Sequence, residues 1–253
     1  MSKVSFDFSG ERFIVTGASS GIGRQIASEL AGAGATVLAI ARRAERLSEL
    51  KENYPERIVP GVLDVRDTEK LREVMQAFVR EYGKFHGAVH AAGTGASTPL
   101  RAYDETIARE IMDISFWSGI RLMQLVNMKK HSEPKCSSVL FSSVSAYVGE
   151  KTHFAYSAAK SALQTAVRTL AKEIYPEGRR INTVSPGWVD TPLAQGALES
   201  GTTDPKMLDR LLLGRGRTED VSGVVLFLLS NRGQWITGTD IVVDGGYLYG
   251  GYN

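Results

Sequence analysis

The chain has almost no cysteine, since Cys136 is the only one in 253 residues. A single thiol cannot form an intrachain disulfide, which fits a reducing compartment. The histidines are also few, and His86, His90, His131 and His153 show no metal-ligand spacing. We therefore expect neither a disulfide-stabilised scaffold nor a metal site.

Long apolar runs are missing as well. Stretches such as 37–41 and 224–229 are far too short to cross a bilayer. The first ten residues carry acidic and polar side chains and lack the apolar core of a signal peptide. The formal net charge is only +2, without a long basic run, which does not favour nucleic-acid binding. We expect a soluble, cytoplasmic protein.

What the sequence does contain is a regular alternation of strand and helix patterns. Near-continuously apolar strands such as 36–41 are typical of strands that are covered on both faces. We therefore predict one α/β domain over 1–253, a Rossmann-like doubly wound parallel sheet of about seven strands with helices on both faces. The predicted strands are 13–15, 36–41, 57–63, 87–92, 139–142, 181–185 and 240–243, and the predicted helices are 22–33, 44–53, 68–82, 104–130, 156–175 and 219–229.

A glycine-rich segment, 16–23, stands between the first predicted strand and the first predicted helix. Its spacing is G-x-x-x-G-x-G, which differs from the common dinucleotide spacing G-x-G-x-x-G. Glycines let a pyrophosphate approach main-chain N–H groups, and a helix N-terminus adds partial positive charge. An ordinary glycine turn is the alternative. The predicted phosphate-binding residues are Gly17, Ser19, Ser20, Gly21, Ile22 and Gly23.

The end of the second predicted strand distinguishes between two nicotinamide cofactors. An NAD site usually has an acidic residue there for the ribose 2′-hydroxyl, whereas an NADP site offers arginine to the 2′-phosphate. This chain has Arg42 and Arg43 and no acid. The sequence therefore predicts NADP(H), although one or both arginines could simply be solvated at the start of a helix.

A tyrosine and a lysine, Tyr156 and Lys160, lie four residues apart on a predicted helix and therefore share a face. A nearby ammonium stabilises phenolate and lowers the pKa of a tyrosine towards neutral pH. Alone, such a pair would usually be an ordinary surface pair. Ser143 strengthens the interpretation because it ends the fifth predicted strand, where ligands of parallel sheets bind. Its neighbour Ser142 is expected to point to the other side of the strand.

In these motifs the sequence resembles the short-chain dehydrogenase/reductase family over essentially its whole length. The resemblance rests on TGASSGIG at 16–23, Asp64-Val65, Ser143, YSAAK at 156–160, NTVSPG at 182–187, ITG at 236–238 and VDGG at 243–246.

The resemblance implies an NADP(H)-dependent enzyme that interconverts a ketone and a secondary alcohol, with Tyr156 as general acid/base. It also implies cofactor contacts for several further residues. These are Asp64 and Val65 at the adenine ring, Ala92 and Gly93 at a ribose, Pro186, Gly187, Val189 and Thr191 at the nicotinamide carboxamide and phosphates, and Tyr156 and Lys160 at the nicotinamide ribose.

Two positions depart from the family pattern. The usual Asn-Asn-Ala-Gly after the fourth strand is His90-Ala91-Ala92-Gly93 here, and His90 is interpreted as a packed residue rather than a base. Ser115 occupies the place of an asparagine that, in the family, supports a helix distortion and a proton relay. Serine can also hydrogen-bond helix carbonyls, so the distortion can survive, and Ser115 is kept as a fourth catalytic candidate.

The substrate is not specified by the sequence. The irregular region 191–216 is either a closing lid or a helical pair that packs for stability or dimerisation. We expect Tyr147, Val148, Phe154 and Trp188 to form an apolar pocket wall. An alcohol or sugar dehydrogenase working oxidatively and a nucleotide-binding pseudoenzyme remain alternatives to a carbonyl reductase.

Partners follow from the resemblance alone, which is strongest to 3-oxoacyl-[acyl-carrier-protein] reductases. A carrier-bound acyl thioester is therefore a candidate substrate, although Glu177 stands where those enzymes often have arginine. Family members form homodimers or homotetramers through the helices predicted here near 104–130 and 155–175. The tail 245–253, with Tyr247, Tyr249 and Tyr252, is a further candidate for assembly.

Overall fold

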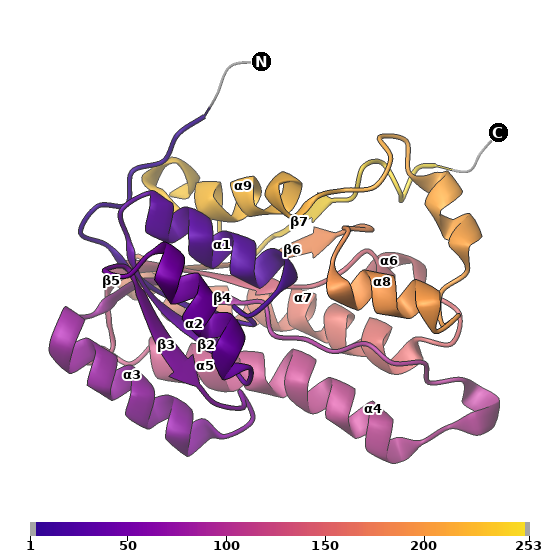
Figure 1. Ribbon diagram of the computed structural model, residues 1–253, viewed down its shortest axis with the longest axis horizontal. Coiled ribbons are helices and arrows are strands. Elements are labelled where there is room, and N and C mark those ends of the chain that lie inside the picture. The colour runs from indigo at the N-terminus through magenta and orange to yellow at the C-terminus, as the bar shows by residue number, and fades with distance from the viewer. Residues whose placement is uncertain (1–3, 251–253) are drawn as a thin grey trace.

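The structure, a computed structural model, describes residues 4–250. Within these residues seven parallel strands form one sheet in the order β3-β2-β1-β4-β5-β6-β7. The predicted Rossmann-like α/β fold is confirmed, with helices on both faces of the sheet (Figure 1). The strands are β1 (Arg12–Thr16), β2 (Thr36–Ala41), β3 (Ile58–Val62), β4 (Phe85–His90), β5 (Ser132–Phe141), β6 (Arg180–Pro186) and β7 (Asp240–Val243).

The helices cover the sheet in two layers. The longer ones are α1 (Gly21–Gly32), α2 (Ala44–Asn53), α3 (Thr68–Tyr82), α4 (Glu105–Met112), α5 (Ser118–Val126), α7 (Phe154–Ile174), α8 (Pro192–Glu199) and α9 (Thr218–Leu229). The short turns are η1 (Leu100–Ala102), η2 (Asp113–Trp117), α6 (Ser145–Val148), η3 (Tyr175–Glu177), η4 (Pro205–Arg210) and η5 (Asn231–Gly233). Between residues 4 and 250, none of these helices is long and apolar enough to cross a membrane.

Successive side chains of a strand point to opposite faces of the sheet, so the strands contribute to an apolar core on each face. In β1, Phe13 and Val15 pack in one apolar cluster with residues of α1, α2 and α9, whereas Ile14 packs in another with residues of α3, α5 and α7. Figure 1 shows α1 and α9 on one side of the sheet and α3 and α5 on the other. Burying each large apolar side chain contributes about 1.5–3 kcal/mol, so both layers hold the sheet firmly.

The sheet reverses its strand order between β1 and β4. From β1 the chain moves outward to β2 and β3, and it then returns to β4 on the other side of β1. The loops that leave β1 and β4 therefore diverge and open a crevice at the carboxyl ends of the strands, where doubly wound sheets bind ligands. This topology determines where the site forms.

The predicted helix 104–130 is wrong in one respect, because it is not continuous. α4 ends at Met112, the π-helical turn η2 follows, and α5 ends at Val126. A π turn adds one residue to a helical turn and often marks a functional site. Periodicity alone cannot reveal one inserted residue, so the break could not be located from the apolar pattern.

The start of β5 was also predicted too late, at 139 instead of 132. Its first half, SEPKC, contains charged residues and a proline, and two serines follow, so the segment before 139 has no apolar pattern. Ser137 is nevertheless buried, because its hydroxyl donates a hydrogen bond of 2.9 Å to the carbonyl of Leu228 in α9. Satisfying the hydroxyl in this way permits a polar residue inside the sheet layer.

The C-terminal segment packs against the region 191–216, which contains α8 and η4. Tyr247 is buried, and the guanidinium of Arg210 lies 4.5 Å from its ring centroid. The amide of Leu213 donates a hydrogen bond of 3.0 Å to Gly245. Tyr247 thus packs within its own chain, Tyr249 is exposed, and Tyr252 lies outside the described residues.

Gly87 in β4 leaves no room for a side chain. A Cβ there would lie 2.7 Å from the Phe13 ring and 2.8 Å from the Ser137 carbonyl oxygen. We expect Gly87→Ala to lower the free energy of unfolding by about 1–3 kcal/mol, because a packed core must be displaced. Urea denaturation of both proteins measures this change.

Gly223→Ala is the matched control, because a Cβ at this exposed position of α9 meets nothing within 4 Å. Alanine should raise stability there by up to about 1 kcal/mol, owing to its higher helix propensity. A Gly87→Ala protein as stable as the wild type would contradict the close packing of this strand.

Candidate active site

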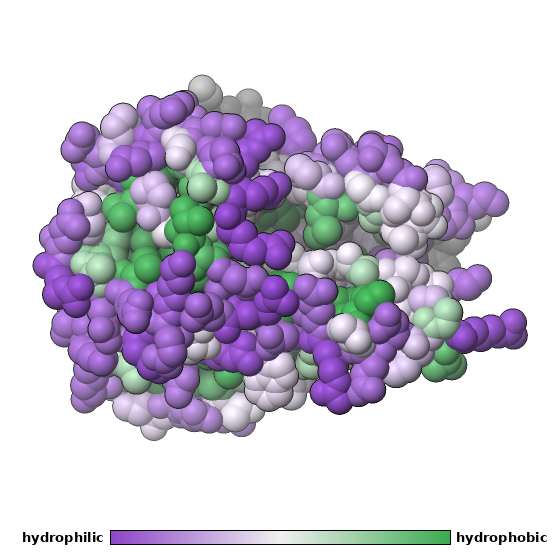
Figure 2. Space-filling view, turned by 60° about the horizontal axis from the view of Figure 1, so that its bottom comes forward, coloured by the Kyte–Doolittle hydropathy of each residue, from purple (hydrophilic) through white to green (hydrophobic). Residues whose placement is uncertain are grey.

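A cleft of about 910 Å³ opens beyond the carboxyl ends of β1, β4, β5 and β6. The molecule is hollowed on the side on which α8 lies in Figure 1 (Figure 2). The predicted site residues Gly17, Ser19, Ser20, Gly21, Ile22, Gly23, Arg42, Arg43, Asp64, Val65, Ala92, Gly93, Ser143, Tyr156, Lys160, Pro186, Gly187, Val189 and Thr191 all line this cleft. Ser115 does not line it.

The glycine-rich loop packs too closely against β4 for side chains. Gly17 has a φ of +72°, and a Cβ there would lie 2.7 Å from backbone atoms of Ala91 and Ala92. A Cβ on Gly23 would lie 2.5 Å from the carbonyl oxygen of Gly17. Because α1 begins at Gly21 with no acidic residue in its first turn, its N-terminus offers an anion free N–H groups and a favourable dipole. These residues fit the pyrophosphate of a dinucleotide.

The two arginines after β2 point to different partners. The guanidinium of Arg43 donates hydrogen bonds to the hydroxyls of Ser19 at 2.8 Å and Ser20 at 2.7 Å. Arg42 is exposed, and its guanidinium lies 3.9 Å from a carboxylate oxygen of Asp64. Arg43 therefore joins the glycine-rich loop, whereas Arg42 lies beside the predicted adenine site.

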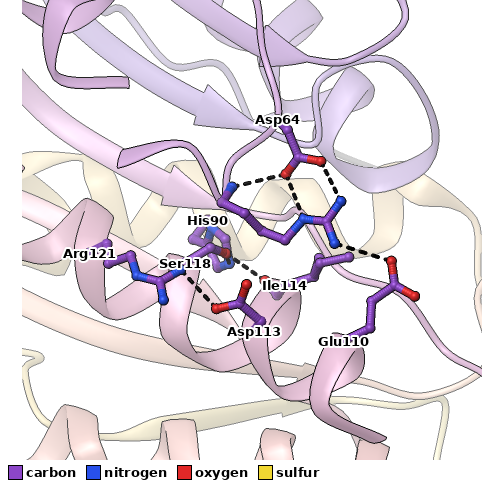
Figure 3. A network of polar contacts seen from close by, with 8 residues as sticks. Asp64, His90, Glu110, Asp113, Ile114, Ser118 and Arg121 are labelled. Carbon is purple, nitrogen blue, oxygen red and sulfur yellow. Dashed lines mark hydrogen bonds and ion pairs between the residues drawn. The ribbon is translucent and has the colours of Figure 1, made fainter. Parts of the chain in front are cut away.

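Asp64 is held by a third arginine that sequence reasoning missed. Arg66 donates hydrogen bonds of 3.0 and 2.7 Å to the two oxygens of Asp64, and it also reaches Glu110 of α4 at 3.3 Å (Figure 3). The Arg66 hydrogen bond holds the pKa of Asp64 below its ordinary value. A fork-like bond of this kind fixes the orientation of the carboxylate. The sequence feature that could have pointed to Arg66 is its position two residues after Asp64.

Ser143, Tyr156 and Lys160 meet at the middle of the cleft. Ser143 lies two residues beyond the end of β5, and its hydroxyl donates a hydrogen bond of 3.2 Å to the Ser145 hydroxyl. Its interaction with the Tyr156 phenol acts to lower the phenol pKa, against the larger effect of burial. Ser142 is otherwise engaged, because its hydroxyl donates to the backbone carbonyl of Lys160 at 3.0 Å. The Lys160 ammonium lies 5.4 Å from the Tyr156 ring centroid and donates to the carbonyl of Phe141 at 2.7 Å.

Burial controls the protonation of this pair. It raises the pKa of Tyr156 to about 12, and the charge of Glu150 acts in the same direction. Burial also lowers the pKa of Lys160 to about 8. At neutral pH the phenol therefore carries its proton, and most of the lysine is still charged.

The π turn brings Ser115 close to the lysine without exposing it. Ser115 is fully buried, and its hydroxyl has no hydrogen-bond partner among the described residues. A Cβ added to Gly93 would lie 3.6 Å from the Lys160 ammonium and 3.8 Å from the Ser115 hydroxyl oxygen. Both groups therefore lie beside the same glycine, Lys160 at the cleft surface and Ser115 behind it.

His90 connects the glycine-rich loop to the π turn. Its Nδ1 lies 2.9 Å from the Thr16 hydroxyl, and its Nε2 lies 3.2 Å from the Ser118 hydroxyl (Figure 3). Ser118 donates its single hydroxyl proton to the Ile114 carbonyl at 2.5 Å, so it can only accept from the ring. His90 is therefore neutral and carries its proton on Nε2, and Thr16 donates to Nδ1. Burial lowers the pKa of His90 to about 3, which agrees with this neutral form.

The segment after β6 closes the other side of the cleft. Thr191 accepts a hydrogen bond of 3.3 Å from the amide of Ala194 and thereby caps α8. A Cβ on Gly21 would lie 3.2 Å from the Thr191 methyl group, so the N-terminal ends of α1 and α8 converge. Thr191 therefore lies beside the N-terminus of α1, and Thr191 and Gly21 both line the cleft.

The comparisons with known proteins agree with this geometry. A family model described as enoyl-(acyl carrier protein) reductase matches residues 17–248. A 3-oxoacyl-[acyl-carrier-protein] reductase of Thermotoga maritima is 32% identical over 243 residues, which cover 94% of this chain and 98% of the relative. The chain belongs to the short-chain dehydrogenase/reductase family. Its members are oxidoreductases that use a nicotinamide cofactor and act on CH–OH or C=O groups.

Other members of this family are similar over comparable lengths. An L-xylulose reductase of Caenorhabditis elegans is 34% identical over 248 residues, covering 96% of this chain and 98% of the relative. A crystal structure from Brucella melitensis, described as a short-chain dehydrogenase/reductase of the glucose/ribitol dehydrogenase type, superposes with a TM-score of 0.89 at 26% identity. It covers 96% of this chain and 99% of its own.

The predicted apolar wall is largely wrong. Trp188 lines the cleft, but Tyr147, Val148 and Phe154 do not. Tyr147 instead donates a hydrogen bond of 2.6 Å to Asp240 of β7, and Phe154 packs against Tyr103 with their ring centroids 5.6 Å apart. Closeness in sequence to Tyr156 does not fix the direction of a side chain, because α6 and the start of α7 turn these residues outward.

The cleft has polar wall residues that sequence reasoning missed. Glu150 and His153, in the loop before α7, both line it. The sequence feature that could have pointed to these two residues is their position within six residues of Tyr156. The family pattern does not identify them, because they lie outside its motifs.

His90 provides a test of the network that surrounds it. We expect ¹⁵N chemical shifts of a neutral Nε2–H imidazole that persists well below pH 6.5, because protonation would place a second proton against the Thr16 hydroxyl. With its folded-state pKa near 3, far below the ordinary value of 6.5, His90 contributes stability that is complete above pH 6.5 and is lost as the pH falls towards 3.

His90→Asn should remove this contribution, lowering the free energy of unfolding at pH 7 by about 1–3 kcal/mol and flattening its acid dependence between pH 7 and pH 5. Urea denaturation at the two pH values measures both effects. An imidazole that titrates near pH 6.5 in the folded protein would contradict the network.

Proposed function

We propose that the protein, as a single catalytic domain over 1–253, is an NADP(H)-dependent oxidoreductase that interconverts a ketone and a secondary alcohol. One observation carries this proposal. The side chains of Ser143, Tyr156 and Lys160 line the same cleft as the glycine-rich loop. A cofactor bound along that loop would extend to a substrate oxygen placed beside Tyr156 and Ser143.

The proposed chemistry divides between the cofactor and the chain. When bound, the reduced cofactor supplies a hydride to the carbonyl carbon. The Tyr156 phenol then gives its proton to the carbonyl oxygen, and the Ser143 hydroxyl hydrogen-bonds the same oxygen. The Lys160 ammonium stabilises negative charge on Tyr156 after the proton has left. Ser115 is proposed to assist from behind Lys160.

The protonation states favour reduction. A phenol whose pKa is about 12 is an acid ready to donate at neutral pH, whereas oxidation of an alcohol requires phenolate. The oxidative reaction, as in an alcohol or sugar dehydrogenase, is the second candidate, since a positive charge near Tyr156 would lower its pKa. The L-xylulose reductase among the relatives makes a sugar ketone a sensible substrate to assay.

A carrier-bound acyl thioester is a further substrate to assay, because of the similarity to a 3-oxoacyl-[acyl-carrier-protein] reductase. Glu177 is unfavourable for an acidic carrier protein, but it pairs with Arg179 at 3.0 Å and with Lys129 at 3.6 Å. These pairs compensate its charge.

We also propose a cytoplasmic homodimer or homotetramer. A groove of about 640 Å³ lies between α4 and α7, and it is lined by Trp117 of the π turn and Phe154 of α7, each a little under half exposed. Exposed aromatic side chains on two neighbouring helices are typical of an interface between subunits.

Tyr156→Phe tests the mechanism. Loss of the phenol proton should lower kcat/KM for ketone reduction by about 10²–10⁴-fold, while NADPH still binds, as nicotinamide fluorescence would show. Tyr175→Phe, at an exposed position of η3, is the matched control and should keep full turnover. NADPH binding without turnover of any ketone or alcohol by the wild type would favour the pseudoenzyme alternative instead.

Arg43→Ala tests the choice of cofactor. Removing the guanidinium should raise KM for NADPH by about 10–100-fold and leave KM for NADH nearly unchanged, because only NADPH carries the 2′-phosphate. Arg42→Ala should have a smaller effect of the same sign. Arg46→Ala serves as control, because Arg46 pairs with Glu49 at 3.1 Å on α2 and does not line the cleft. Equal wild-type efficiency with NADH and NADPH would overturn the NADP(H) assignment.

A further inference from the structure

Two polar side chains of the cleft have no part in the proposed hydride transfer. Glu150 and His153 come from the loop that joins α6 to α7, and both line the cleft beside Tyr156. Glu150 is half-buried, and His153 is only 9% exposed. Both side chains are therefore within reach of a molecule bound in the cleft.

The Glu150 carboxylate is uncompensated. Among residues 4–250, no lysine, arginine or histidine nitrogen lies within 4.0 Å of it, and its oxygens accept no hydrogen bond. Its chain neighbour Lys151 is exposed, the Lys160 ammonium is bound to the Phe141 carbonyl, and Arg210 lies over Tyr247. A half-buried carboxylate without an ion pair is available to a hydrogen-bond donor or a cation that enters the cleft.

The charge of Glu150 also reaches the reacting end of the cleft. It contributes to the raised pKa of the Tyr156 phenol, and it has the same effect on Tyr247 at the back of the 191–216 region. A substrate whose oxygen lies beside Tyr156 would experience the same negative potential. An anionic substituent there would be repelled, and a cationic one attracted.

His153 adds a second acceptor. Its Nδ1 lies 2.9 Å from the carbonyl oxygen of Lys151, so the ring donates its Nδ1 proton there and keeps Nε2 as an acceptor in its neutral form. The cleft wall also has apolar residues such as Val144 and Trp188 and hydroxyl side chains such as Ser145. Within residues 4–250, the loop before α7 therefore offers the Glu150 carboxylate and the His153 ring as acceptors, and the Lys160 ammonium of the same cleft is bound to the Phe141 carbonyl.

We propose that Glu150 selects substrates by their charge. It favours ketones that carry a hydrogen-bond donor, an ammonium above all and a hydroxyl next, and it disfavours ketones that carry a carboxylate. This inference rests on the proposed reductase activity. It makes Glu150 a specificity-determining residue, while proton transfer stays with Tyr156.

Three ketones of equal size test the inference: 4-(aminomethyl)acetophenone, 4-(hydroxymethyl)acetophenone and 4-acetylbenzoate. With NADPH and the full-length protein, kcat/KM should fall in that order. Glu150→Gln should reduce the ammonium-to-carboxylate ratio of kcat/KM by about tenfold or more, the size expected for one nearby charge. Comparing ratios between the two proteins cancels the intrinsic reactivities of the ketones.

Glu173→Gln, an exposed substitution in the second half of α7, is the matched control and should leave the ratio unchanged. If Glu150→Gln does not fold, raising the salt concentration with the wild type is the second measurement, and the ratio should fall as the charge is screened. Turnover with a ratio that neither the variant nor salt alters would overturn the role of Glu150 and leave the reductase intact. Failure to turn over any of the three ketones would count against the proposed function itself.

Discussion

The site depends on one close contact, between the turn after β1 and the end of β4. Gly17 has no side chain, and the backbone of Ala91 and Ala92 occupies the space that a Cβ would need. Thr16 joins the two segments from within, since it donates to His90 and accepts from the Ala92 amide at 3.3 Å. Because the loop is held against β4, the N-terminus of α1 points into the crevice instead of across the sheet edge.

Much of this could be predicted from the sequence, because the signals are local. Apolar strands alternating with amphipathic helices indicated the sheet, and the glycines of 16–23 indicated the tight turn after β1. Tyr156 and Lys160 share a face of α7 because helix periodicity requires it. Ser143 follows from the rule that parallel strands present ligands at their carboxyl ends.

The rest depends on contacts between segments that lie far apart in the chain. Arg66 reaches Glu110, and His90 reaches both Thr16 and Ser118, across separations that no local pattern records. The division of roles between Arg42 and Arg43 depends on how α2 leaves β2, which a pair of adjacent arginines does not reveal. Whether a wall residue such as Glu150 has an ion-pair partner depends on which cations pack beside it, and only the three-dimensional structure determines that.

The π turn lets α4 and α5 pack against different parts of the protein. An α-helix turns by about 100° per residue, so one extra residue rotates the apolar face of α4 relative to that of α5. α4 directs Ala108 and Ile111 to α7, whereas α5 directs Leu122 and Met123 to the core beneath the sheet. A nearly continuous helical rod thus serves two partners that lie in different directions. Deleting a single residue from Asp113–Trp117 would restore a regular helix. Either α4 would then lose its packing against α7, or α5 would lose its packing against the core.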